Sequence, residues 1–117
     1  MDPTGLGNLI IGYDEDPAQG SPNKPIQTGD RSGSHNLIIG RYHRFTGTAF
    51  GGLVAGEQNT ISYWVASVTG GAGNIASGPY ASVTGGAHNA ASAELASITG
   101  GTSNTASGGY SVILGGQ

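Results

Sequence analysis

The sequence SVTGGAGNIASGPYA occupies residues 67–81, and its pattern returns as SVTGGAHNAASAELA at 82–96 and SITGGTSNTASGGYS at 97–111. These are consecutive 15-residue units. A repeat this short cannot hold the helix pairs of larger repeat families, but it fits one coil of a solenoid with two short strands and two bends. The sequence therefore predicts an all-β fold, a parallel β-solenoid of 15-residue coils.

Apolar residues that recur at this spacing predict the core. Alternation along a strand points Val68 inward and its neighbours Ser67 and Thr69 outward. The return strand is expected to place Ala76 inward, with Ile61, Ala91 and Ala106 at equivalent positions. Steps of one full period give the predicted core row: Leu53, Val68, Val83, Ile98 and Ile113.

Upstream of residue 53 the repeat loosens. The segment NLIIG at 36–40 is separated from LVAG at 53–56 by slightly more than this period, and the letters NLIIG also stand at 8–12. The Pro- and Gly-rich stretch between the two copies is typical of a loop. We predict an irregular N-terminal coil with an insertion over 1–33 and regular solenoid repeats over 34–117. The chain ends in mid-repeat, which is expected of a fragment.

The row beside the predicted core row suggests contact between identical chains. A coil that buries one Val and a few Ala side chains recovers little of the conformational entropy lost by ordering its backbone. The adjacent row has apolar residues at both ends and Thr in the middle. A face exposed to solvent does not require apolar residues in register, so a subunit interface is predicted. The alternative is that these are scattered surface hydrophobic residues. The predicted subunit interface consists of Ile10, Ile38, Val54, Thr69, Thr84, Thr99 and Leu114.

These units resemble the head repeats of trimeric autotransporter adhesins of the YadA type, which read roughly S-V-A-I-G followed by an Ala-rich return strand. NLIIG at 36–40 and LVAG at 53–56 are nearest to that wording, and the resemblance covers about residues 34–117 and the isolated 8–12. It implies a left-handed parallel β-roll, assembled as a homotrimer. The sequence departs from the pattern in its 15-residue period, in Gly70 and in a column of Asn.

The resemblance also implies a function and a location. Such heads project from the bacterial surface and bind host matrix proteins such as collagen, so the expected partners are two sister chains and a matrix protein or surface glycan. The alternatives are a purely structural stalk of a phage or cell-surface fibre and an ice-binding solenoid. Ice binding would use the regular hydroxyl rows of the Ser-x-Thr words at 67–69, 82–84 and 97–99.

Composition excludes several other classes of function. The net charge is −3, and the four basic residues are Lys24, Arg31, Arg41 and Arg44, which argues against nucleic acid. No apolar run is long enough to cross a bilayer, and the N-terminus lacks the basic and apolar regions of a secretory signal. The chain contains no Cys.

Two groups of polar residues are candidate sites. Arg41, Tyr42, His43, Arg44 and Phe45 form the one basic and aromatic cluster, predicted to bulge outward as a ligand patch, with a solvated loop as the alternative. The column Asn59, Asn74, Asn89 and Asn104 is interpreted as a structural ladder of side-chain amides rather than a binding site.

The remaining polar residues do not predict an enzyme. Asp14, Glu15 and Asp16 lack the spacing of a calcium loop, and the three His residues are too far apart for a recognisable metal site. The Gly-rich turns are followed by neither Lys nor a helix, so they are not phosphate loops. Trimeric β-helix acyltransferases use a hexapeptide repeat, which a 15-residue period does not match. We therefore expect no catalytic residues and no cofactor.

Overall fold

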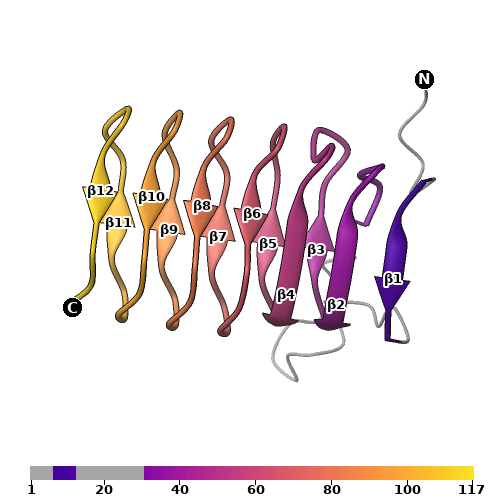
Figure 1. Cartoon of the computed structure of the whole chain (residues 1–117), viewed down its shortest axis with the longest axis horizontal. Coiled ribbons are helices and arrows are strands. Elements are labelled where there is room, and N and C mark those ends of the chain that lie inside the picture. The colour runs from indigo at the N-terminus through magenta and orange to yellow at the C-terminus, as the bar shows by residue number, and fades with distance from the viewer. Residues whose placement is uncertain (1–6, 13–30) are drawn as a thin grey trace, which may run out of the picture.

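The computed structural model describes residues 7–12 and 31–117, so most of the predicted insertion over 1–33 lies outside the described residues. The described chain forms a parallel β-solenoid whose coils stack along one axis (Figure 1). The predicted all-β fold and its 15-residue coils are confirmed. Every pairing between named strands is parallel and joins one coil to the next.

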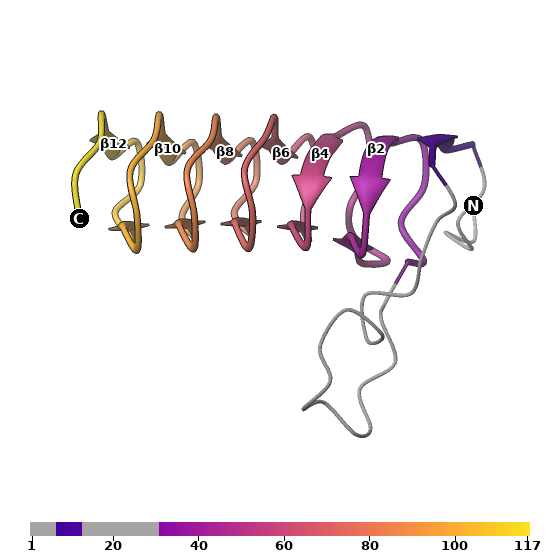
Figure 2. The same cartoon turned by 90° about the horizontal axis from the view of Figure 1, so that it is seen from below.

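Two sheets run along the solenoid, one on each side of the coils (Figure 2). The seven-stranded sheet consists of β1 (Leu9–Ile11), β2 (Leu37–Arg41), β4 (Leu53–Glu57), β6 (Ser67–Val68), β8 (Ser82–Val83), β10 (Ser97–Ile98) and β12 (Val112–Ile113). The five-stranded sheet consists of β3 (Arg44–Phe45), β5 (Thr60–Ile61), β7 (Ile75–Ala76), β9 (Ala90–Ala91) and β11 (Thr105–Ala106).

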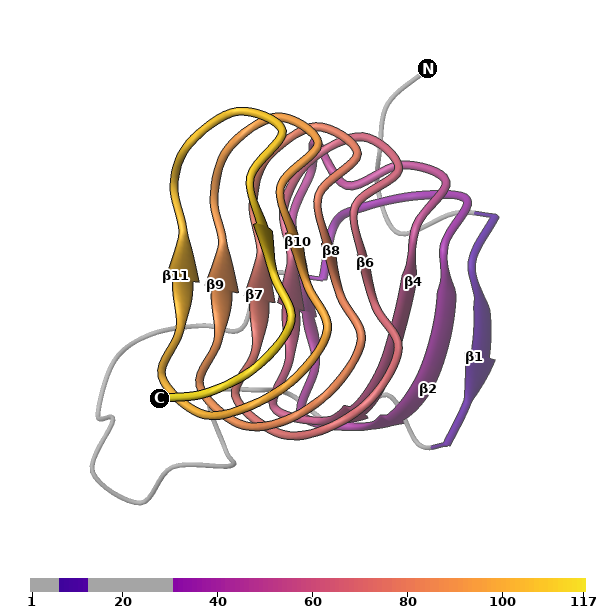
Figure 3. The same ribbon diagram turned by 60° about the vertical axis from the view of Figure 1, so that its left-hand side comes forward.

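The core lies between the two sheets, inside the stacked coils that the oblique view shows (Figure 3). The five-stranded sheet contributes a buried row of Phe45, Ile61, Ala76, Ala91 and Ala106, so the predicted inward positions of the return strand are confirmed. The seven-stranded sheet contributes a buried row of Ile38, Val54, Val68, Val83 and Ile98, with Ile10 and Ile113 partly buried at its ends.

This register corrects the predicted rows upstream of Val68. Val54 pairs with Val68, and Leu53 pairs with Ser67, so the predicted core position of Leu53 is wrong. The predicted interface is wrong at Ile38 and Val54, because both side chains are buried between the sheets, and Ile10 belongs to the same inward row. A slip of one residue along a strand moves every side chain to the opposite face, which explains these errors together.

The slip arises from one extra residue in the turn after β6. Glu57 pairs with Ala72, which leaves two residues between Val54 and Glu57 but three between Val68 and Ala72. The extra residue interrupts the ladder as a bulge does, so β6 ends at Val68 while β4 continues through Glu57. The paired apolar residues Val54 and Val68 are therefore separated by one residue less than the full period. Asn59 and Asn74 keep the full period.

Candidate binding surfaces

The Asn column lines the turn that leads from the seven-stranded to the five-stranded sheet. Asn74 is fully buried, and its Nδ2 donates to the carbonyl oxygen of Gly70 at 3.2 Å in its own coil and to that of Gly86 at 3.0 Å in the next. Its Oδ1 accepts the backbone N–H of Asn89 at 2.9 Å. Asn59 and Asn89 make the same set of bonds, and Asn104 makes the two that Nδ2 donates.

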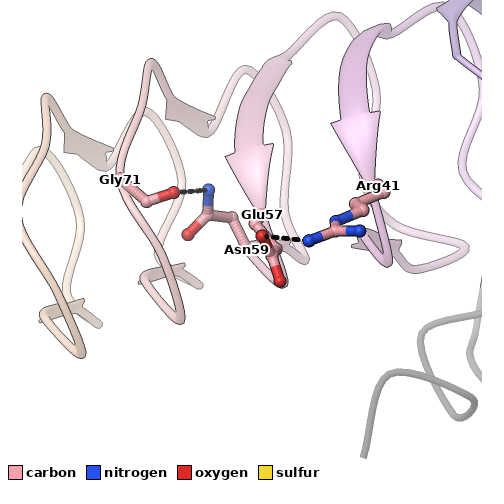
Figure 4. Close-up of polar contacts among 4 residues, drawn as sticks. All are labelled: Arg41, Glu57, Asn59 and Gly71. Carbon is pink, nitrogen blue, oxygen red and sulfur yellow. Dashed lines mark hydrogen bonds and ion pairs between the residues drawn. The ribbon is translucent and has the colours of Figure 1, made fainter.

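The ladder satisfies buried amide groups that would otherwise cost free energy, and it joins each coil to both neighbours. Figure 4 shows one link, from Asn59 to Gly71, beside the ion pair of Arg41 and Glu57. Because the amide atoms are bonded within the solenoid, the structural interpretation of the column is confirmed.

His43 occupies the ladder position of the first described coil of this series. It is buried, its Nδ1 lies 3.2 Å from the backbone nitrogen of Asn59, and its Nε2 lies 2.9 Å from the carbonyl oxygen of Ile39. The N–H of Asn59 is a donor and the Ile39 oxygen is an acceptor, so the arrangement fits a neutral imidazole with its proton on Nε2. His43 therefore substitutes for an Asn.

A second, shorter ladder was missed by the sequence analysis. Asn8 Oδ1 accepts the N–H of Asn36 at 2.8 Å, and Asn36 Oδ1 accepts the N–H of Gly52 at 2.8 Å. Asn36 Nδ2 also donates to the carbonyl oxygen of Ala49 at 3.1 Å. The signal available was the repeated NLIIG, in which Asn8 and Asn36 hold the same position.

The predicted patch from Arg41 to Phe45 does not bulge outward as a unit. His43 and Phe45 point into the solenoid and are buried, so the prediction is wrong for these two residues. Arg41 is exposed, while Tyr42 and Arg44 are half-buried. Arg41 donates to Glu57 at 3.1 Å and lies 5.4 Å from the centroid of the Tyr42 ring. An exposed ion pair of this kind contributes little to stability.

The outer face of the seven-stranded sheet changes character along the solenoid. In its middle the buried row is flanked by Ser67, Ser82 and Ser97 on one side and by Thr69, Thr84 and Thr99 on the other. Towards the N-terminus the same two rows are apolar. We call this part the apolar face, and it consists of Leu9, Ile11, Leu37, Ile39, Leu53 and Ala55.

Large apolar side chains also line one corner of the solenoid, at the turn that returns to the seven-stranded sheet. All of them are exposed, with exposed fractions between 42% and 72%. We call this row the corner ridge, and it consists of Phe50, Trp64, Val65, Tyr80, Leu95 and Tyr110. Sequence reasoning missed it, although Val65, Tyr80, Leu95 and Tyr110 follow the 15-residue spacing.

The backbone at this corner explains how the ridge side chains are displayed. Val65, Tyr80, Leu95 and Tyr110 have φ between 53° and 63°, the left-handed region. In this conformation each backbone N–H points to the preceding coil. For example, the N–H of Tyr80 donates to the carbonyl oxygen of Trp64 at 3.0 Å. The side chain then points away from the core.

The corner ridge borders an open pocket of about 560 Å³. Its lining residues are Ser34, Gly47, Thr48, Phe50, Trp64, Val65 and Tyr80. Gly47 and Thr48 lie in the segment from Phe45 to Val54, which is two residues longer than the equivalent segment from Ile61 to Val68. The longer turn supplies one wall, and the ridge supplies the other.

The described residues contain neither a candidate metal site nor a candidate membrane-spanning helix. Within residues 7–12 and 31–117, no three of His, Cys, Asp and Glu come together as a metal site would require. The acidic run from Asp14 to Asp16 lies outside these residues. In the part of the chain that the structure describes, no helix is long and apolar enough to cross a membrane.

No family model, no curated protein and no solved structure matches this chain.

Proposed function

We propose that the chain is a non-enzymatic structural and adhesive module of a bacterial cell or virion surface, a rigid head or spacer that works as a homotrimer. The observation that carries this proposal is the apolar face. It extends over three neighbouring strands, β1, β2 and β4, whose partners are fixed by backbone pairing. The resemblance to the head repeats of trimeric adhesins supports the same assembly.

The apolar face presents more apolar surface than a solvated sheet needs. Leu9 is 62% exposed and Ile11 54% exposed, and Ile39 stands beside Ile11 in the adjacent strand. Contiguous exposed apolar surface of this kind marks sites of association. Packing of the same face from sister chains around a common axis would bury it, with every chain making equivalent contacts. In this proposal the interface stays on the same sheet as in the sequence-based prediction but consists of different residues.

The C-terminal coils serve as a spacer in this proposal. Their buried row on the five-stranded sheet is Ala only, and the outer rows beside β6, β8 and β10 are Ser and Thr. In the last coil these rows become apolar again at Val112 and Leu114, which are both exposed. Hydrogen bonds between coils hold them at strand spacing. Arg41, Tyr42 and Arg44 remain as the surface-accessible part of the predicted ligand patch, on the coil that also carries the apolar face.

Oligomeric state tests the proposal most directly. Sedimentation velocity of the chain at micromolar concentration is expected to give three times the 11.6 kDa of one chain. The double variant Leu37→Ser, Leu53→Ser copies the Ser of the later coils into the apolar face and is expected to sediment as a monomer. Leu95→Ser makes the same substitution on the corner ridge and serves as the matched control, which should stay trimeric. A monomeric parent chain would refute the assembly.

Solid-phase binding separates the adhesive role from the purely structural one. Saturable binding of the trimer to immobilised collagen or fibronectin supports an adhesive head. A trimer that binds neither protein would be assigned to a stalk.

Ice binding is a second candidate because six hydroxyl side chains flank the buried row in register on three adjacent strands. Ser82 Oγ lies 3.3 Å from Ser97 Oγ, and Thr69 Oγ1 donates to the carbonyl oxygen of Thr84 at 2.8 Å. Part of the hydroxyl capacity is thus used within the sheet, and only three coils contribute. Thermal hysteresis in a freezing assay would favour this function, and its absence would remove it.

A further inference from the structure

Four of the six corner-ridge residues have a backbone conformation that is costly for them: Val65, Tyr80, Leu95 and Tyr110. Left-handed φ is strained for a non-Gly residue, and a β-branched residue such as Val65 is a clear outlier there. The opposite corner has the same conformation and, after Tyr42 in its first coil, carries small or polar residues: Gln58, Gly73, His88 and Ser103. Small or polar residues would be sufficient if the turn required only this backbone conformation. The run of large apolar side chains on the ridge therefore requires another explanation.

The pocket beside the ridge has the size and lining of a ligand site. Its volume of about 560 Å³ falls within the range of small-molecule sites, roughly 300–1,000 Å³. Phe50, Trp64 and Tyr80 provide aromatic surface. The lining also contains the hydroxyl groups of Ser34, which is buried, and of Thr48, which donates to the carbonyl oxygen of Ser62 and can accept from a ligand. Aromatic faces with nearby hydrogen-bonding groups suit a ligand whose own surface is apolar on one side and hydroxylated around its edge.

Charge narrows the class of ligand. None of the seven residues that line the pocket is charged, and the whole chain carries a net charge of −3. A polyanion would find no cation in the pocket, and a cationic peptide would find no carboxylate there. The lining therefore complements a neutral, hydroxyl-rich ligand.

Periodicity indicates that the ligand is a chain. Phe50 pairs with Trp64 across adjacent coils, and Tyr80 lies one coil further on, at the position that Val65 occupies in the coil of Trp64. The three aromatic residues therefore belong to three successive coils, which stand at strand spacing, about 4.8 Å. Sugar rings in an extended β-linked glycan follow one another at nearly this spacing, and their axial C–H groups form an apolar face.

We propose that the pocket and the corner ridge bind a neutral glycan, with successive sugar rings against Phe50, Trp64 and Tyr80. The inference rests on the proposed adhesive function and deepens it, because it names the class of surface ligand and the corner that binds it. The apolar face on the seven-stranded sheet is a separate surface, so trimerisation leaves the ridge accessible.

The chain contains a single Trp, which makes its fluorescence a direct reporter of this site. The probes are cellohexaose, laminarihexaose and chitohexaose, three neutral β-linked hexasaccharides, titrated into the assembled protein. We expect at least one to give a saturable change in Trp64 emission, and Tyr80→Ser to raise its Kd about tenfold. His88→Ser is the matched control, since the exposed ring of His88 lies on the opposite corner with φ 56°, against φ 58° at Tyr80, and it should leave the Kd unchanged.

Three outcomes would overturn the inference. They are no saturable change with any of the three probes, an equal loss in the Tyr80→Ser and His88→Ser variants, and a heparin hexasaccharide that binds more tightly than the neutral probes. Self-association through the ridge, seen as a concentration-dependent emission change that Tyr80→Ser abolishes, would also overturn it. If the hexasaccharides fail while the trimer still binds immobilised matrix protein, the ridge assignment falls and the adhesive function stands.

Discussion

Coils near the N-terminus fill their interior with Ile38, Phe45 and Ile61, whereas the coils from β7 onward place only Ala on the five-stranded side of the core. On the seven-stranded sheet, β2 and β4 have five residues each, whereas the strands of the later coils have two residues and are followed by an extra turn residue. The first group relies on apolar burial. The second relies to a larger degree on hydrogen bonds between coils.

The magnitudes support this division. Burying a Phe contributes roughly 1.5–3 kcal/mol, and an Ala methyl contributes about 0.8 kcal/mol. A ladder Asn such as Asn89 makes three hydrogen bonds, with a net contribution of roughly 0.5–1.5 kcal/mol each. A thin β-solenoid can therefore exchange core volume for a polar ladder from one coil to the next without a change of fold.

The largest expected effect comes from the N-terminal core. Phe45→Ala should lower the free energy of unfolding by about 3–5 kcal/mol, because it leaves a cavity that the stacked coils cannot close. Ala91→Gly, further along the same buried row in β9, should cost only about 1–2 kcal/mol. Urea denaturation at fixed protein concentration measures both. Equal losses would contradict the division between the two groups of coils.

Removal of a ladder amide is expected to come next. Asn89→Ala leaves the N–H of Asn104 without its partner and removes one of the two hydrogen bonds to the carbonyl oxygen of Gly101, which still accepts the N–H of Ala87, at a cost of about 2–4 kcal/mol. Hydrogen exchange should show the loss of protection centred on the coils beside residue 89. The control is His43→Asn, which places the residue of the later coils in the ladder and should change stability by less than about 1 kcal/mol. A tolerated Asn89→Ala would show that the ladder contributes little.

The smallest effect concerns the turn that sets the later coils apart. Gly86 has φ 86°, and a Cβ there would overlap the carbonyl oxygen of Gly101 and lie 2.7 Å from Asn89 Nδ2, so Gly86→Ala should cost about 1–3 kcal/mol. At Gly85 a Cβ meets nothing within 4 Å, and Gly85→Ala should stay within about 0.5 kcal/mol of the parent. Thermal denaturation of the Gly86→Ala and Gly85→Ala variants measures this difference in stability. Equal midpoint temperatures would show that the turn is not constrained at Gly86.

The 15-residue spacing was sufficient to predict the solenoid, because the Asn column and the inward Ala of β7, β9 and β11 keep that spacing. It was not sufficient for the register of the first coils, where Val54 pairs with Val68 one residue short of the full period. An offset of one residue in a turn is invisible to a count that assumes equal steps, yet it decides which side chains are buried.

The candidate patch and the corner ridge show the other limit. Arg41 to Phe45 was predicted to bulge outward because its coil has an extra residue, but strand alternation buries Phe45 and the ladder buries His43. The ridge was overlooked because turns are expected to carry Gly or Asn where φ is positive, and Tyr80 does not fit that expectation. A large apolar residue recurring in a turn was the signal available.

The uniform bonding of the ladder has a consequence for how long such a protein can become. Asn74 and Asn89 each make the same bonds to the coil before and the coil after, so the segment from Ser82 to Ala96 meets equivalent neighbours on either side. Tandem duplication of that segment would add one more layer, about 4.8 Å of reach, and disturb neither end. The solenoid would then lengthen during evolution by duplication of whole coils, without a change to the surfaces at the N-terminal end.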